Sequence, residues 1–164
     1  MSTLEPAPKH IWRLSKYDDL SGRGGLRVDG RWHTRPQSIV YCAEHPHTAF
    51  LELERHTGGE MFFPDDLLAL KIEVPNHAKM QVIAEADLDP LWSDEVSGYR
   101  VCQPIGDDWL RSIRTPLLCV PSVVEVGRRN ILLNPAHPDA TDFRLAEIVH
   151  PATGQPFPDY IRKP

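Results

Sequence analysis

The amino-acid sequence predicts a single α+β domain over residues 1–164, in which short helices pack on a mixed central β-sheet. A chain of 164 residues is long enough for one hydrophobic core but short for two. Its 41% hydrophobic and 25% charged residues form an ordinary globular balance, which argues against long disordered segments. The chain contains 16 prolines, about twice the average share, and these disfavour helices longer than about three or four turns. Many strands and few, short helices are therefore expected.

Two strands and a helix are predicted in the first half of the chain. Runs rich in apolar, β-branched and aromatic side chains predict strands at residues 10–16 and 38–43. In the loop between them, the Asp-Gly pair at residues 29–30 is typical of a hairpin turn. Residues 45–57 predict a helix that begins after its first proline, with Thr48 as a candidate N-cap.

Further strands are predicted in the second half. The clearest is LLALKIEV at residues 67–74, where apolar and charged side chains alternate and Leu70 and Ile72 share one face. The strand at 117–124 is expected to end or bulge at Pro121, because proline cannot donate a hydrogen bond to a sheet. Residues 81–88 are predicted as a strand that runs into a loop, and residues 129–135 and 143–151 as two further short strands.

A second short helix is predicted at residues 106–114. Trp109 and Ile113 lie four residues apart and so share a helical face, behind Asp107 or Asp108 as the N-cap. The last six residues are not assigned to an element.

Composition excludes several classes of protein. The formal net charge of −5 disfavours direct nucleic-acid binding, because a phosphate backbone requires clustered Lys and Arg. No apolar run approaches the ~20 residues of a membrane span, and the N-terminus lacks the apolar core of a signal peptide. The cysteines, Cys42, Cys102 and Cys119, are odd in number and far apart, which supports neither a disulfide framework nor a zinc site. A cytoplasmic protein with buried, reduced cysteines is expected.

Residues 21–36 form a locally basic loop in this acidic chain. They contain four arginines, Arg23, Arg27, Arg31 and Arg35, and a single acid, Asp29. Four glycines in the loop disfavour a helix there. The loop is either a site for a phosphate-bearing small molecule, since the guanidinium fork binds phosphate well, or a solvated hairpin with surface arginines. Neither the P-loop nor the Rossmann glycine pattern is present.

Glu52 and Glu54 do not form a catalytic pair. Residues two apart on a helix point to nearly opposite faces, so only one of them can line a site, which argues against a two-carboxylate glycosidase. His56, one turn after Glu52, could pair with it. The histidines show no HExxH pattern, and no metal site is expected.

The other candidate nucleophiles lack their usual context. Ser122 follows a proline without the GxSxG elbow, so it is as well explained by bonding to backbone groups at a strand end. No spacing pairs a histidine with Cys42 or Cys119, which disfavours a cysteine hydrolase. Asn130 and Asn134 are expected to bond the backbone in a proline-bounded turn.

Taken in order, these motifs resemble the RES domain family, named for its Arg, Glu and Ser. The matching segments are IWRL, GRWHTRPQSIVYCAE, AFLELERH, VPSVV and NILLNPAHPD, which span about residues 11–145. The resemblance implies the toxin of a bacterial toxin–antitoxin pair, a fold similar to that of the ADP-ribosyltransferases, and a site that consumes NAD⁺. Matched motif by motif, the family's site residues are Arg31, Tyr41, Glu52 and Ser122. Glu52 is preferred to Glu54 because AFLE fits the family spacing.

The resemblance also implies what these residues do. Arg31, helped by Arg23 or Arg27, would hold the diphosphate of NAD⁺ or its nicotinamide-side phosphate. Tyr41 would stack on the cationic nicotinamide ring. Glu52 would bond the ribose hydroxyls and stabilise the oxocarbenium-like charge that develops as nicotinamide leaves.

Ser122 would orient Glu52 or the ribose. Nicotinamide leaves as a neutral group, so no strong general acid is needed, which agrees with the absence of a second carboxylate.

The acceptor of ADP-ribose stays open at this point. A protein side chain as acceptor would make the chain an ADP-ribosyltransferase, which we take as the main hypothesis, whereas water or phosphate would make it an enzyme that degrades NAD⁺. A non-catalytic module that binds a nucleotide or a partner is a further alternative, and Glu52 discriminates against it because an anion binder has no use for a carboxylate.

An inhibitor is the expected partner. The resemblance implies an antitoxin with a helix-turn-helix DNA-binding part, which would also supply any contact with DNA. We expect the antitoxin to cover the basic loop with an acidic or carboxylate-terminated segment. Homodimerisation is compatible with the sequence, although no patch for it stands out.

Overall fold

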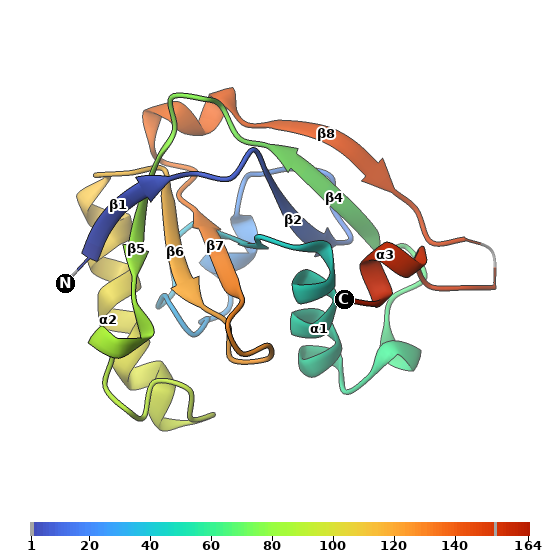
Figure 1. Ribbon diagram of the computed structural model, residues 1–164, viewed down its shortest axis with the longest axis horizontal. Helices are drawn as coiled ribbons and strands as arrows, with labels where there is room; N and C mark the ends of the chain where they lie inside the picture. Colours follow the sequence, from blue (N-terminus) through green and yellow to red (C-terminus); the bar gives the residue numbers. More distant parts are fainter. Residues whose placement is uncertain (1, 153) are drawn as a thin grey trace.

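An eight-stranded mixed sheet is the framework of the protein in the computed structural model, which describes residues 2–152 and 154–164 (Figure 1). Its strands are β1 (Ser2–Pro6), β2 (His10–Ser15), β3 (Val40–Ala43), β4 (Leu68–Glu73), β5 (Lys79–Ile83), β6 (Leu117–Pro121), β7 (Arg129–Leu133) and β8 (Arg144–Val149). They lie in the order β1-β5-β6-β7-β3-β2-β4-β8. The neighbours β5 and β6 are parallel and the other neighbouring pairs are antiparallel, which confirms the predicted mixed sheet and α+β class.

The sheet divides into two halves between β3 and β2. These strands share one registered pair, Trp12 with Ala43, whereas β2 and β4 are paired along the whole of β2. Figure 1 shows β5, β6 and β7 on one side of the molecule and β4 and β8 on the other. Side chains from both halves, among them Ile72, Met80 and Leu133, form one buried cluster. This cluster does not cover the opposite face of strands β6, β7 and β3. Helix α2 and the cavity described below lie on that face.

Three helices pack on this sheet: α1 (Pro46–Thr57), α2 (Ser97–Ser112) and α3 (Asp159–Arg162). Helix α2 covers β6 and β7, because Cys102 and Trp109 are buried in a cluster with Leu118 and Leu132 of those strands. Helix α1 follows β3 after a short turn and packs beside α3 at the C-terminal end of the chain (Figure 1). Short 3₁₀ turns lie at Arg23–Leu26, Glu60–Phe62, Glu85–Asp87 and Pro138–Asp142. Among the described residues, none of the helices has the length and apolar character needed to cross a membrane.

Helix α2 corrects two sequence-based predictions. It is 16 residues long and contains Pro104, whereas we expected only a short helix at residues 106–114 and none beyond about four turns. The buried apolar face of α2, which includes Trp109, outweighs the backbone hydrogen bond that a proline removes. Asp107 lies inside this helix and caps nothing. Its buried carboxylate instead accepts hydrogen bonds from the backbone and hydroxyl of Thr34, at 2.8 and 2.6 Å, which fixes the basic loop on α2.

The predicted helix at residues 45–57 is confirmed, but its predicted cap is wrong. Proline occupies the first turn of α1, and the N-cap residue is His45, whose side chain makes no capping bond. The Thr48 hydroxyl donates to Glu125 across the molecule instead of to the helix end.

Other predictions shift by a few residues. The tight turn of the basic loop lies at Arg31 and Trp32, two residues after the expected Asp-Gly pair, because the N–H of Gly30 donates to the carbonyl of His33 at 3.1 Å. The strand predicted to run into a loop within residues 81–88 is β5, which begins two residues earlier, at Lys79, and ends at Ile83. The predicted end of a strand at Pro121 is confirmed in β6.

Candidate functional site

A cavity of about 690 Å³ opens between the basic loop, helix α1 and the ends of β6 and β7. This volume lies within the range of small-molecule sites, roughly 300–1,000 Å³. Arg31, Tyr41 and Glu52, which the sequence proposed as one site, all line this cavity. They come from three segments, the loop before β3, β3 itself and α1. Polar residues that the sequence analysis had not assigned to the site also line it: Arg13, Arg55, His56, Glu95, Tyr99 and Asn130.

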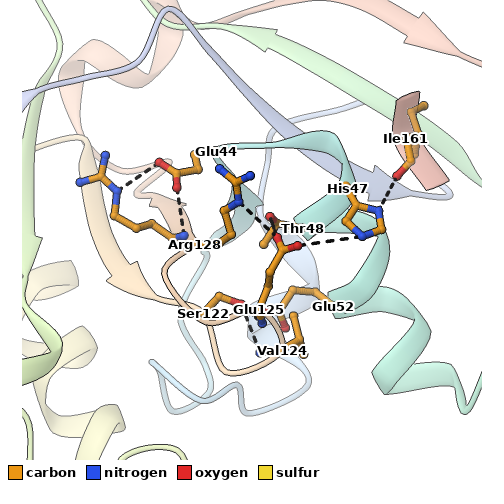
Figure 2. Close-up of polar contacts among 10 residues, drawn as sticks. Glu44, His47, Thr48, Glu52, Ser122, Val124, Glu125, Arg128 and Ile161 are labelled. Atoms are coloured by element: carbon orange, nitrogen blue, oxygen red, sulfur yellow. Dashed lines mark hydrogen bonds and ion pairs between the residues drawn. The ribbon is translucent and has the colours of Figure 1, made fainter. Parts of the chain in front are cut away.

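The Glu52 carboxylate is held from one side. Its Oε1 atom accepts hydrogen bonds from Ser122 Oγ at 3.0 Å (Figure 2) and from Asn130 Nδ2 at 2.6 Å. Both donors lie at the ends of neighbouring strands. Glu54 does not line the cavity but borders a separate surface hollow. His56 lines the cavity, although no hydrogen bond joins it to Glu52 in the part of the chain that the structure describes.

Asn130 therefore has a different role from the one we expected. Only Asn134 bonds the backbone, through Leu110 and Ala136, as predicted. The amide of Asn130 instead donates to Glu52, and its own Oδ1 atom is buried without a hydrogen-bond partner among the described residues. The adjacency of β7 to β3 and β6, which a single sequence does not reveal, brings this side chain to the cavity.

Arg31 is fixed against the start of α2. Its Nη1 atom donates to the carbonyls of Trp92 and Asp94, at 2.8 and 3.0 Å. The guanidinium lies 4.9 Å from the centroid of the Tyr99 ring, within cation–π range. A Cβ atom on Gly98 would collide with Arg31 Nη1, so this glycine is needed for the close approach. The guanidinium is thus oriented before any ligand binds.

Tyr41 is fixed by its hydroxyl. The phenolic oxygen accepts the backbone N–H of Trp32 at 3.2 Å and lies 2.7 Å from Nδ1 of His33. A side chain at Gly30 would collide with the Tyr41 ring, so the loop can close over it only with glycine there. Burial raises the pKa of Tyr41 far above its ordinary range, which keeps the phenol neutral. The ring can present a face to a ligand, but its hydroxyl is not a base.

Comparison with known proteins identifies the family. Residues 7–158 match the family model described as the RES domain. The chain belongs to the RES domain family. The relative named Toxin Res from Pseudomonas putida is 37% identical over 136 residues, which cover 82% of this chain and 90% of that protein.

A second relative, the Prs ADP-ribosylating toxin of a Sphingobium species, is 37% identical over 148 residues, 84% of this chain and 89% of that protein. Among solved structures, a chain in the crystal structure of the M. tuberculosis MbcT–MbcA toxin–antitoxin complex superimposes with a TM-score of 0.72. It is 17% identical and the match covers 89% of this chain and 85% of that one, which shows a shared fold.

The cavity of this RES domain excludes two of the arginines proposed for the diphosphate. Arg23 lies outside the lining, with a side chain that is 76% exposed and 3.8 Å from Asp19. Arg27 is also outside the lining. The cavity contains Arg13 and Arg55 in their place, and Arg55 donates to Glu95 at 3.2 Å across its mouth.

The three cysteines of the RES domain are structural. All are buried and none lines the cavity. Burial raises the pKa of Cys42 and of Cys119 to about 12, and that of Cys102 to about 11. Such thiols carry almost no nucleophilic thiolate near neutral pH, so the geometry gives a cysteine hydrolase no support.

Side chains of metal-ligand type gather at one place outside the cavity of the RES domain. His77, Asp139 and Asp142 have ligand atoms within 4.8 Å of one another. His77 and Asp142 are exposed and already paired at 3.0 Å. This group lies apart from Glu52 and takes no part in the chemistry considered below.

The buried phenol of Tyr41 predicts an alkaline loss of stability. The folded pKa is raised, so the stabilisation is complete below the unfolded value of about 10 and is lost as pH rises above it, because only the unfolded chain then releases the proton. The free energy of unfolding should fall by about 1.4 kcal/mol per pH unit above pH 10 from this group. The buried thiols lower the stability in the same pH range. Urea unfolding of the wild type and of Tyr41→Phe should therefore be compared between about pH 8 and about pH 11.5, a range that spans the unfolded pKa of tyrosine. The difference between the two curves is the contribution of Tyr41. Parallel curves would show that Tyr41 ionises equally well in the folded chain.

Proposed function

We propose that this RES-domain protein is the toxin of a toxin–antitoxin pair, and that it breaks the nicotinamide–ribose bond of NAD⁺ and transfers ADP-ribose to a protein acceptor. The observation that carries the proposal is a single carboxylate, Glu52, held by two donors on one oxygen in a cavity that also contains Arg31. The Sphingobium relative, which is named as an ADP-ribosylating toxin, supports transfer as the reaction class.

Glu52 supplies the electrostatic part of the reaction. Departure of nicotinamide as a neutral molecule leaves positive charge on the ribose, and a fixed carboxylate stabilises that charge. Ser122 and Asn130 occupy Oε1, so Oε2 is the oxygen available to the ribose. The donors are already in place, so little reorganisation is needed when the charge develops.

Arg31 and Tyr41 bind and orient the substrate. The Arg31 guanidinium is held by two carbonyls and lines the cavity, where it can donate to a phosphate without first losing a flexible conformation. The half-buried Tyr41 ring offers a π face to the cationic nicotinamide. A purely binding module would place the carboxylate of Glu52 beside the phosphates, where it would weaken binding.

A time course of NAD⁺ with the purified protein, freed of any partner, tests the proposal. We expect nicotinamide to appear in NMR spectra or on chromatography, and mass analysis to find ADP-ribose on an acceptor protein when cell lysate is added. Free ADP-ribose or its 1-phosphate as the sole second product would replace transfer by hydrolysis or phosphorolysis. No loss of NAD⁺, with or without lysate, would contradict an enzymatic function and favour the binding module.

An antitoxin partner follows from the same proposal. An enzyme that drains NAD⁺ harms its host, so an inhibitor should block the cavity by covering the basic loop at residues 21–36 with a carboxylate-rich segment. Unchanged affinity for the antitoxin after alanine replaces both Arg27 and Arg35 would exclude this docking mode. A helix-turn-helix part in the antitoxin remains a prediction.

A further inference from the structure

The loop between β6 and β7, residues 122–128, contacts helix α1 at Glu52 through Ser122. A second polar contact joins the same loop to α1 one helical turn before Glu52. The Thr48 side chain is fully buried, and its hydroxyl donates to Oε1 of Glu125 at 2.7 Å (Figure 2). Thr48 and Glu52 are four residues apart on α1, so their side chains lie on the same face. The loop therefore contacts this face of α1 at two points. Ser122 of the loop bonds Glu52, and Glu125 of the loop bonds Thr48.

The two contact points are linked within the loop. The backbone N–H groups of Val124 and Glu125 both donate to Ser122 Oγ, at 3.2 and 3.3 Å. A serine hydroxyl has one hydrogen to donate and two lone pairs to accept with. With both lone pairs engaged by the loop, the hydrogen of Ser122 points to Glu52. The conformation of residues 122–125 thus decides where Ser122 directs its donor.

The carboxylate of Glu125 lies between two basic side chains, those of Arg128 and His47. Arg128 Nε lies 3.6 Å from Oε1, and His47 Nε2 lies 4.0 Å from Oε2. The other ring nitrogen of His47 is 3.2 Å from the carbonyl of Ile161 in α3 (Figure 2). Because the side chain of Glu125 is only 22% exposed, its ion pair with Arg128 is less screened than a fully exposed surface pair.

We propose that Thr48 and Glu125 are positioning residues: their hydrogen bond holds the β6–β7 loop on α1, so that Ser122 and Asn130 orient Glu52 in the cavity. Neither Thr48 nor Glu125 lines the cavity, so they act through Ser122 and not on the substrate. The effect on turnover rests on the proposed function, whereas the effect on the loop does not.

Kinetics of nicotinamide release distinguish positioning from substrate binding. Thr48→Val, which keeps the side-chain shape but removes the donor, should lower kcat about 10-fold, the equivalent of one hydrogen bond. The KM for NAD⁺ should change less than about 2-fold, because an interaction that matters only in the transition state leaves binding alone. Thr48→Ser restores the donor and should recover most of kcat. Thr57→Val, which removes another hydroxyl of α1 far from Glu125, is the matched control.

A double variant tests the proposed partner. Glu125→Ala combined with Thr48→Val should be no slower than Glu125→Ala alone, because the contact between Thr48 and Glu125 is already lost in that single variant. Additive losses, a raised KM with unchanged kcat, or wild-type kcat in Thr48→Val would each overturn the proposal.

Hydrogen exchange gives a readout that does not depend on turnover. The amides of Val124 and Glu125 should exchange faster in Thr48→Val than in the wild type and Thr48→Ser, while amides of β7 should not change. If the wild type releases no nicotinamide, the proposed function fails. The exchange rates alone then decide whether the hydrogen bond between Thr48 and Glu125 holds the β6–β7 loop on α1. If these two amides exchanged equally fast in all variants, the proposed role of the hydrogen bond between Thr48 and Glu125 would be wrong, even in an active enzyme.

Discussion

Glu52→Gln is expected to release nicotinamide from NAD⁺ about 100- to 1,000-fold more slowly than the wild type, the loss that follows removal of one preorganised electrostatic group. The variant keeps an oxygen that can accept from Ser122 and Asn130 but loses the charge that, in the proposed reaction, stabilises the ribose cation. The cavity should stay intact, so the dissociation constant for NAD⁺ should change far less than kcat. Stopped time courses at saturating NAD⁺, with calorimetric binding in parallel, measure both quantities.

Glu54→Gln is the matched control for this prediction. It makes the same chemical change two residues away on α1, on a side chain that does not line the cavity. Its kcat should equal that of the wild type. If Glu54→Gln were the slow variant and Glu52→Gln were not, the register proposed from the AFLE motif would be wrong.

Strands and helices with a clear local pattern of apolar and charged residues were predictable from the sequence. The strand at residues 67–74 shows this well, because Leu70 and Ile72 are buried on one face as β4 and Glu73 is exposed. Helix α2 shows the limit. Its interior Pro104 argues against a helix locally, and only packing on β6 and β7 makes it one.

The candidate site was predictable only as far as ordered motifs could name its members. Arg31, Tyr41 and Glu52 belong to such motifs, and the fold brings them to one cavity. Asn130 could not be assigned, because its role depends on the order of β6, β7 and β3 in the sheet. Tyr99 was missed for a similar reason, since α2 places it under the guanidinium of Arg31.

The same limitation applies to the proposed diphosphate site, where charge alone drew attention to Arg23 and Arg27 of the basic loop, which do not line the cavity. Arg13 lies on β2, outside that loop, yet it lines the cavity, whereas Arg23 does not. Arg13 is half-buried, and although its charge, like that of Arg23, helps to lower the pKa of Asp19, it forms no ion pair within 4.0 Å among the described residues. Arg23 is exposed and already lies near Asp19.

Arg13→Ala should therefore weaken NAD⁺ binding about 10- to 100-fold, the range expected for loss of a charge-assisted hydrogen bond. Arg23→Ala removes the same charge from the same acidic chain, so any loss it causes reports long-range electrostatics only, which should stay below about 2-fold at physiological ionic strength. Titration calorimetry in a Glu52→Gln background, where NAD⁺ persists, measures both variants without turnover. Equal weakening by the two changes would mean that the basic loop moves over the cavity and that Arg23 reaches the ligand after all.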